Sequence, residues 1–174
     1  MTMRNVHHLV RLCGVLALAA LLAACGFQLR GKADLAFDTL HIQGPRLTIS
    51  KELKKQLEIN GVDIVESAEK AELVMELMSE ENEERILSLS GEGVVREYEL
   101  FYRVHFRLRN PASETWGPPQ VIENRRDFTY DDTQLLAKQF ERDQIYNDMR
   151  SDATRELLRR LVVQKPEQLK PAGS

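Results

Sequence analysis

The sequence predicts an α+β two-layer sandwich, in which a mixed four-stranded sheet packs against two helices, the C-terminal one long. Two observations carry most of this prediction. Residues 98–109 alternate between apolar and mainly charged side chains with a period of two, which is typical of a strand with one buried face. Residues 131–163 contain neither glycine nor proline and place apolar side chains at helical spacing.

The first part of the domain is expected to be a strand followed by a helix. Residues 39–43 alternate polar and apolar side chains, and the Gly-Pro that follows ends the strand. Ser50 is a candidate N-cap for a helix over residues 51–59, whose two leucines lie four apart on one face. Asn60 and Gly61 suit the end of that helix. Residues 62–65 are a candidate for a further short extended piece.

A long hairpin is expected in the centre of the chain. Residues 71–79 predict its first strand, and the acidic run at residues 80–84 is interpreted as part of a solvated tip. Glycines mark the turn within the tip at residues 86–95. In the strand at residues 98–109 the even positions form an apolar core face. Residues 120–130 then return as the fourth strand.

The opposite face of the strand at residues 98–109 is basic, and it carries Arg103, His105, Arg107 and Arg109. One interpretation is cross-strand pairing with acids of the neighbouring strand. The acids expected for this pairing are Glu72, Glu76 and Glu80. The other interpretation is a phosphate-binding face, because arginine matches phosphate geometry with two hydrogen bonds.

The long C-terminal helix is expected to start at Asp131-Asp132-Thr133, where acidic residues suit the helix dipole, and to run to about Val163. Its expected apolar stripe consists of Leu136, Phe140, Met149, Ala153, Leu157 and Leu161. Residues 37–165 are therefore assigned to one domain, and residues 166–174 to a flexible tail.

The N-terminus predicts a lipoprotein signal peptide at residues 1–24. Two arginines precede an apolar run that is too short to span a bilayer, which takes about 20 residues. The run ends in a lipobox, Leu22-Ala23-Ala24-Cys25-Gly26. Small residues admit the peptidase, and the Cys25 thiol would take a diacylglyceryl group before its new amino group is acylated. An ordinary secretory signal with a chance cysteine is the alternative. Residues 25–36 would form a lipidated tether.

Composition excludes several classes of function. Processing would leave 22 Lys+Arg (24 − 2) against 27 Asp+Glu, a net charge of −5, which argues against nucleic-acid binding. Both cysteines are used or removed at the N-terminus, so no disulfide is expected. The two histidines that remain are too scattered for a metal site. No catalytic motif is present, and we expect neither an enzyme nor a bound cofactor other than the covalent lipid.

The residues after the lipobox extend the signal. They resemble the start of the mature LptE family, the lipopolysaccharide-assembly lipoproteins of Gram-negative outer membranes, in the run Cys25-Gly26-Phe27-Gln28-Leu29-Arg30-Gly31. The resemblance continues at residues 56–62, 96–98 and 137–138. It implies an outer-membrane lipoprotein on the periplasmic side that plugs and supports the LptD β-barrel, one copy per barrel, and binds lipopolysaccharide. The alternative is a generic outer-membrane lipoprotein that acts as an envelope scaffold.

The resemblance also implies where lipopolysaccharide binds. It places a ligand-binding lysine early in the C-terminal helix, which matches Lys138. The second basic contact of the family lies in the central hairpin. The matching residues here, 87–91, include no basic side chain, so the flanking Arg96 and Arg85 are candidate substitutes. A solvated lysine on the polar side of the helix is the alternative for Lys138. The hairpin tip is the candidate element for insertion into the barrel, and a solvated turn is the alternative. The residues concerned are Ile86, Leu87, Leu89, Gly91 and Gly93.

Overall fold

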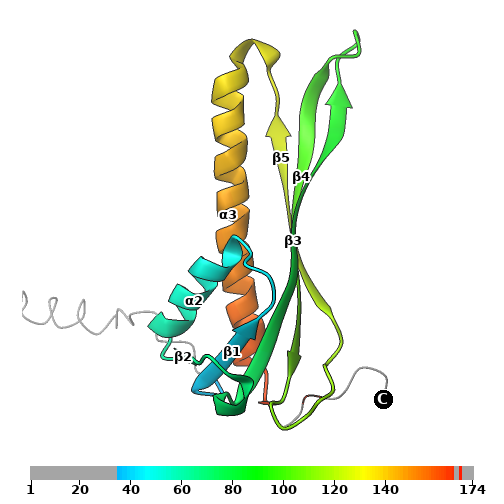
Figure 1. The fold of residues 1–174 in the computed structure, drawn as a ribbon. Coiled ribbons are helices and arrows are strands. Elements are labelled where there is room, and N and C mark those ends of the chain that lie inside the picture. Colours follow the sequence, from blue (N-terminus) through cyan, green and yellow to red (C-terminus); the bar gives the residue numbers. More distant parts are fainter. Residues whose placement is uncertain (1–34, 167–168, 170–174) are drawn as a thin grey trace, which may run out of the picture. The chain divides into compact units, whose positions relative to one another are not determined.

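The computed structural model describes residues 35–166 and residue 169 (Figure 1). The signal peptide, Cys25, most of the tether and most of the tail therefore lie outside the described residues. In chain order the elements are β1 (Thr39–Gln43), α2 (Ile49–Ile59), β2 (Asp63–Ile64), the 3-10 helix η1 (Ala68–Lys70), β3 (Leu73–Leu89), β4 (Val95–Arg109), β5 (Gln120–Thr129), the 3-10 helix η2 (Asp132–Gln134) and α3 (Leu135–Val162).

The sheet has five strands in the order β2-β1-β3-β4-β5. β1 pairs in parallel with β2 and β3, whereas β3, β4 and β5 pair antiparallel. The α+β class, the mixed sheet and the long C-terminal helix are confirmed, but the predicted count of four strands is wrong. The additional strand is β2, which comprises two residues of the extended piece. Two residues are too few for periodicity to identify a strand.

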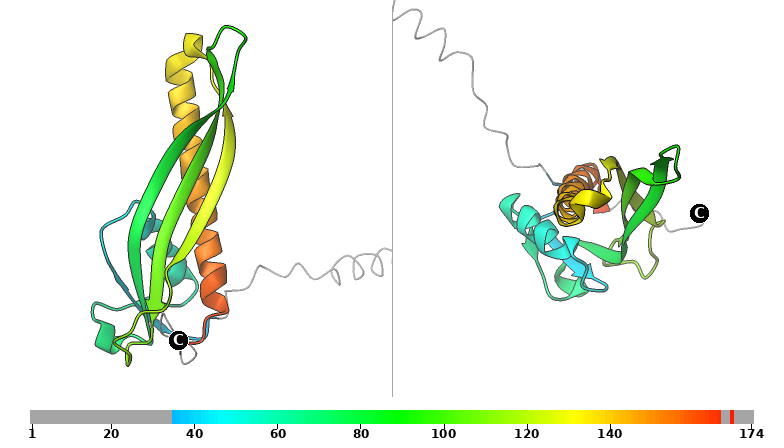
Figure 2. Two further views of the ribbon diagram at one scale, coloured as in Figure 1. Left: turned by 90° about the vertical axis from the view of Figure 1, so that its right-hand side faces the viewer. Right: turned by 90° about the horizontal axis from the view of Figure 1, so that it is seen from above.

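Both helices lie on one side of the sheet, as Figure 2 shows from above. Leu53 and Leu57 of α2 are fully buried against it. α2 begins before Ser50, which is not the N-cap: its hydroxyl instead accepts a hydrogen bond from Leu47 N at 3.2 Å, inside the first turn. Glycine is required at Gly44, where φ is +111° and any Cβ would collide with the carbonyl oxygen of Leu77.

β3 is twice as long as expected, because the acidic run continues the strand instead of lying in a solvated tip. An extra residue at Met78 forms a β-bulge: Leu77 pairs with Phe106, and Ser79 with the next residue of β4, His105. Such a bulge exchanges the faces to which odd and even positions point. Glu80 therefore lies on the helix-facing side, opposite Val104.

Four of the six residues predicted for the apolar stripe of α3 are correct. Met149, Ala153, Leu157 and Leu161 are fully buried, but Leu136 and Phe140 are 80% and 67% exposed. Phe140 and Met149 are nine residues apart, about two and a half helical turns, so they point to opposite sides. The helix itself starts at Leu135, because the predicted start, residues 131–133, forms a turn and the beginning of η2.

The outer face of the sheet carries a ladder of ion pairs. Arg107 pairs with Glu76, and the Nε2 atom of His105 lies 3.8 Å from Glu81. Arg103 bridges Glu83 on β3, at 2.5 Å, and Glu123 on β5. The cross-strand interpretation of the basic row thus matches the geometry. Of its three expected partners, only Glu76 pairs with a residue of the row.

The other two expected partners are committed elsewhere. The bulge carries Glu80 to the helix-facing side, and Glu72 accepts a hydrogen bond from Asp38 N at 2.6 Å. Arg109, the last member of the row, donates to Ser113 O at 2.9 Å and lies 5.2 Å from the centre of the Trp116 ring. Its charge therefore meets carbonyl oxygens and an aromatic face instead of a carboxylate.

Candidate functional site at the distal end

One end of the domain combines the end of the long hairpin, residues 83–98, which includes the tip at residues 86–95, with the start of α3, residues 135–146, and we call it the distal end. Both segments lie at the top of Figure 1 and of the left view of Figure 2. Two contacts fasten them: Arg142 pairs with Glu84 at 3.2 Å, and the Tyr146 hydroxyl donates to Glu83 O at 3.1 Å. Burial raises the pKa of Tyr146 to about 12, so this hydroxyl stays protonated.

The hairpin turn is built around Ser90. Its backbone nitrogen donates to Val94 O at 2.7 Å, and its hydroxyl accepts from Val94 N at 3.2 Å. Gly93 takes a positive φ of +80°, which glycine adopts without strain. The apolar residues predicted for this tip, Ile86, Leu87 and Leu89, are all exposed.

The start of α3 adds exposed apolar side chains to the same end. We call the combined set the distal apolar residues: Ile86, Leu87, Leu89, Val94, Leu135, Leu136 and Phe140. The last three were not predicted to lie on the surface, because two of them, Leu136 and Phe140, belong to the predicted apolar stripe. The helical phase of Leu136 and Phe140 relative to Met149 was the signal that identifies them.

Lys138 lies on the sheet-facing side of α3, in phase with Arg142 and Tyr146, and its side chain is only 16% exposed. The Nζ atom is 2.8 Å from Glu141 and 5.3 Å from the centre of the Phe128 ring. This position differs from the alternative of a solvated lysine on the polar side of the helix. The aliphatic stem is covered while the ammonium group remains at the surface.

Arg96 and Arg85 separate onto different sides. Arg96 is exposed, and its carbonyl accepts from Tyr130 N at 2.8 Å. The pKa of Asp131 is lowered, mainly by hydrogen bonds from Thr133 and in part by the charge of Arg96, which lies near the start of α3. Arg85 instead lies on the outer face, 2.5 Å from Glu83, and its guanidinium is stacked over the Phe101 ring. Arg96 therefore lies near the start of the helix that carries Lys138, whereas Arg85 lies on the outer face of the sheet.

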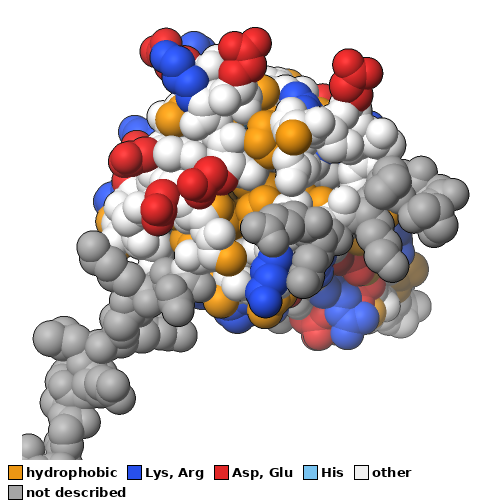
Figure 3. Space-filling view, turned by 90° about the horizontal axis from the view of Figure 1, so that it is seen from below, with side chains coloured by type: hydrophobic (Ala, Val, Ile, Leu, Met, Phe, Trp, Pro, Cys, Tyr) orange, Lys and Arg blue, Asp and Glu red, His pale blue; other side chains and the backbone are white. Residues whose placement is uncertain are grey.

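The opposite end, which we call proximal, carries a cavity of about 550 Å³ between the start of β1 and the end of α3. Figure 3 views the domain from this side, where apolar side chains lie among acidic and basic ones. The cavity is lined by one acid, Glu72, and one base, Lys165. Its one base is therefore balanced by one carboxylate, which accepts a hydrogen bond from Asp38 N at 2.6 Å.

Within residues 35–166, no cluster of His, Cys, Asp and Glu could hold a metal ion. Across that same range, no helix combines the length and apolar character needed to cross a membrane.

Comparisons with known proteins place the chain among lipoproteins. It is 26% identical to the LPS-assembly lipoprotein LptE of Yersinia enterocolitica over 164 residues, which cover 91% of this chain and 78% of the relative. The corresponding protein of Pectobacterium atrosepticum is 28% identical over 154 residues, covering 85% and 83% of the two chains.

Solved structures share the fold. Lipoprotein B of Nitrosomonas europaea superposes with a TM-score of 0.64 at 37% identity, covering 77% of this chain and 88% of that one. The rare lipoprotein B of Shewanella oneidensis gives a TM-score of 0.63 at 32% identity, with coverage of 70% and 91%. The family model for lipopolysaccharide assembly, LptE, matches residues 37–161, which is nearly the whole described domain. The resemblance found in the sequence is therefore confirmed, and the chain belongs to the LptE family of lipopolysaccharide-assembly lipoproteins.

Proposed function

We propose that this protein assembles lipopolysaccharide into the outer leaflet together with an LptD-like β-barrel, one copy per barrel. In this proposal it plugs and supports the barrel, and acyl chains on Cys25 hold it on the periplasmic side of the outer membrane. Two or more chains would give stable anchoring where one gives only marginal binding. Membership of the LptE family supports this role over that of a generic envelope scaffold.

The distal end is our proposed lipopolysaccharide site, and one observation carries it. Exposed apolar side chains occur at the same end as the cations Lys138 and Arg96, and the exposed Leu135 lies three residues before Lys138, on the same side of α3. Lipid A combines acyl chains with phosphates, so a site for it needs apolar surface beside positive charge. Because the net charge of the chain is negative, the positive charge for an anionic ligand must come from a local group of cations. We favour Lys138 and Arg96 over Arg85, which Glu83 occupies on the other face.

Replacing both cations by glutamine, Lys138→Gln with Arg96→Gln, is expected to raise the dissociation constant for lipopolysaccharide about tenfold at low salt. Glutamine is preferable to aspartate at Lys138, because another carboxylate would lie against Glu141. Binding of the purified full chain to fluorescent lipopolysaccharide measures the effect. Lys54→Gln with Lys55→Gln, two exposed residues of α2, is the matched control. Unchanged binding in the test variant would place the ligand elsewhere.

The hairpin tip is our proposed contact with the barrel. A porin-type lumen is polar, and the ion-paired outer face of β3 and β4 suits such surroundings. Deleting residues 88–93 is expected to reduce co-purification of the barrel from detergent-solubilised outer membranes, while the melting temperature of the isolated protein changes little. The turn is exposed and distant from the core, so little stability depends on it. A large fall in melting temperature with intact co-purification would contradict this assignment.

A further inference from the structure

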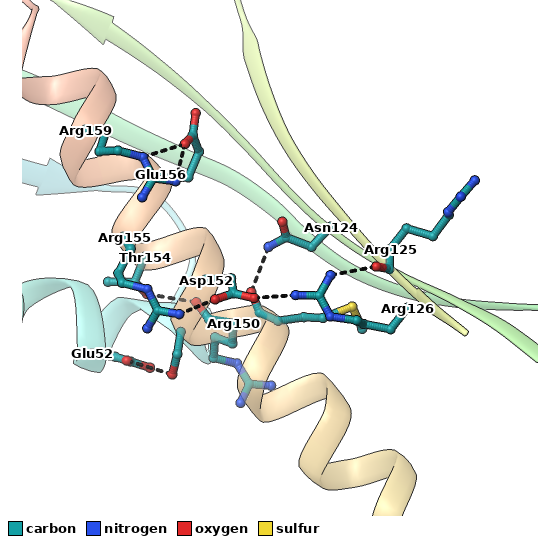
Figure 4. Close-up of polar contacts among 12 residues, drawn as sticks. Glu52, Asn124, Arg125, Arg126, Arg150, Asp152, Thr154, Arg155, Glu156 and Arg159 are labelled. Carbon is teal, nitrogen blue, oxygen red and sulfur yellow. Dashed lines mark hydrogen bonds and ion pairs between the residues drawn. The ribbon is translucent and has the colours of Figure 1, made fainter. Parts of the chain in front are cut away.

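A groove of about 300 Å³ runs between β5 and the C-terminal half of α3, away from the distal end. Arg155, Arg159 and Arg160 of α3 line it, and Arg126 of β5 pairs with Asp152, which also lines it, so these four are counted as its arginines. We call it the arginine groove; Figure 4 shows much of its network of contacts. Arg155 lies about 25 Å along the helix from Lys138, so the two regions are separate.

The groove has more positive than negative charge. Its four arginines share two carboxylates. Asp152 accepts from Arg126 at 2.7 Å and also pairs with Arg155. Glu156 accepts from Arg159 at 2.9 Å and from Arg160 at 3.2 Å. These hydrogen bonds lower the pKa of Glu156, which keeps its carboxylate ionised.

A third acid, Glu123, also lines the groove. Glu123 is engaged by Arg103 from the outer face of the sheet. With Arg126 included, four arginines in and beside the groove face three carboxylates, an excess of one positive charge on a chain whose net charge is −3.

The guanidinium groups are available to a partner. The side chains of Arg126, Arg155 and Arg159 are each more than half exposed. Each guanidinium has five N–H donors, more than the contacts within the groove engage. All four cations are arginine rather than lysine, and arginine is the residue suited to two-pronged recognition of carboxylate or phosphate.

The floor of the groove is the free edge of β5. Val121 O accepts from Arg160 at 2.9 Å, and Arg125 O accepts from Arg126 at 2.8 Å. In an antiparallel pair the N–H and C=O of one residue point the same way, so these residues turn their backbone groups away from β4. An exposed strand edge can accept an extended segment. Carboxylates bind arginine more strongly than neutral carbonyls do, so an acidic segment would draw these arginines off the edge.

We propose that the arginine groove binds an extended acidic segment of a partner protein along the edge of β5. Length favours a polypeptide over a single phosphate group: the stretch of β5 from Val121 to Arg126 spans about 17 Å. Alternating acidic side chains of such a segment would reach the arginines while its backbone pairs with the strand. This inference concerns a different surface from the distal end and does not rest on the function proposed there.

The test uses the full-length lipidated protein in detergent and a fluorescein-labelled peptide of alternating glutamate and valine. Fluorescence polarisation at low salt should show saturable binding to the unmodified protein. Arg155→Glu with Arg159→Glu should raise the dissociation constant about tenfold or more, because charge contacts become repulsions. Each carboxylate keeps its second arginine, and Arg155→Gln with Arg159→Gln repeats the test with a milder change. The control is Lys54→Glu with Lys55→Glu, which alters net charge equally on exposed α2 positions.

Three outcomes would overturn the proposal. The first is no binding of the glutamate peptide to the unmodified protein. The second is an equal loss in the α2 control, which would indicate a general effect of charge. The third is saturable binding of inorganic phosphate, lost in both arginine variants, without binding of the peptide. That result would assign the groove to phosphate groups.

Discussion

Replacing Glu80 by alanine is expected to lower the free energy of unfolding by about 1–3 kcal/mol, the cost of leaving enclosed hydrogen-bond donors without their acceptor. The Glu80 side chain is 9% exposed and joins three elements. It accepts from the Tyr102 hydroxyl at 2.7 Å, from Arg150 Nε at 3.1 Å and from Ile49 N at 3.2 Å. Alanine would leave these donors, including a largely buried guanidinium, without their acceptor.

Urea denaturation of the two proteins measures this effect, as a lower midpoint with little change in slope. Glu81→Ala is the matched control, because the bulge at Met78 leaves that neighbour on the outer face, where it is more than half exposed. Its change should stay within about 0.5 kcal/mol. Equal losses at Glu80 and Glu81 would contradict the assignment of the two side chains to opposite faces.

Leu157→Ala is the second substitution with a large expected effect, a loss of about 2–5 kcal/mol. Leu157 is fully buried between α3 and the sheet, so truncation removes apolar contacts and leaves a cavity. Leu136→Ala, the same change on the same helix, removes a side chain that is 80% exposed and should cost less than about 0.5 kcal/mol.

Thermal or urea unfolding of the Leu157 and Leu136 variants compares them directly. The Leu136 variant should also bind lipopolysaccharide more weakly than the unmodified protein if the distal apolar residues contact acyl chains. A destabilisation at Leu136 as large as that at Leu157 would mean that the first turns of α3 pack against the sheet, contrary to the phase described above.

The strand now called β4 shows what sequence can establish. Its core face was predicted from alternation alone, and Leu100, Tyr102, Val104, Phe106 and Leu108 are all buried. The period of two is a property of one extended backbone and needs no knowledge of a partner. The sequence predicts a β3 that is too short, because its bulge depends on the pairing between two strands. The bulge cannot be recognised from the residues of one strand, so the acidic run is interpreted as a solvated tip.

The candidate site was predictable to a similar degree. The resemblance proposes Lys138, and the apolar residues and glycines at residues 86–95 propose the hairpin tip; both stay predictions, whereas helical phase would have placed Phe140 on the surface. The arginine groove could not be foreseen, because its cations come from β5 and α3, some 30 residues apart in the chain. Glu80 was expected on the basic side of the sheet, and only the bulge explains its burial beside Arg150.

The extra residue at Met78 also constrains how hairpins could be exchanged between members of this family. Removing that single residue would turn Glu81 and Glu83 towards α3 and turn Glu80 and Glu84 to the outer face, although the composition of the strand would hardly change. A chimera must therefore be joined beyond Met78 in matching parity, or must take the bulge along with the donor hairpin. In a chimera joined one residue out of register, the side chains of the donor hairpin that should face α3 would point to the outer face of the sheet, and the reverse.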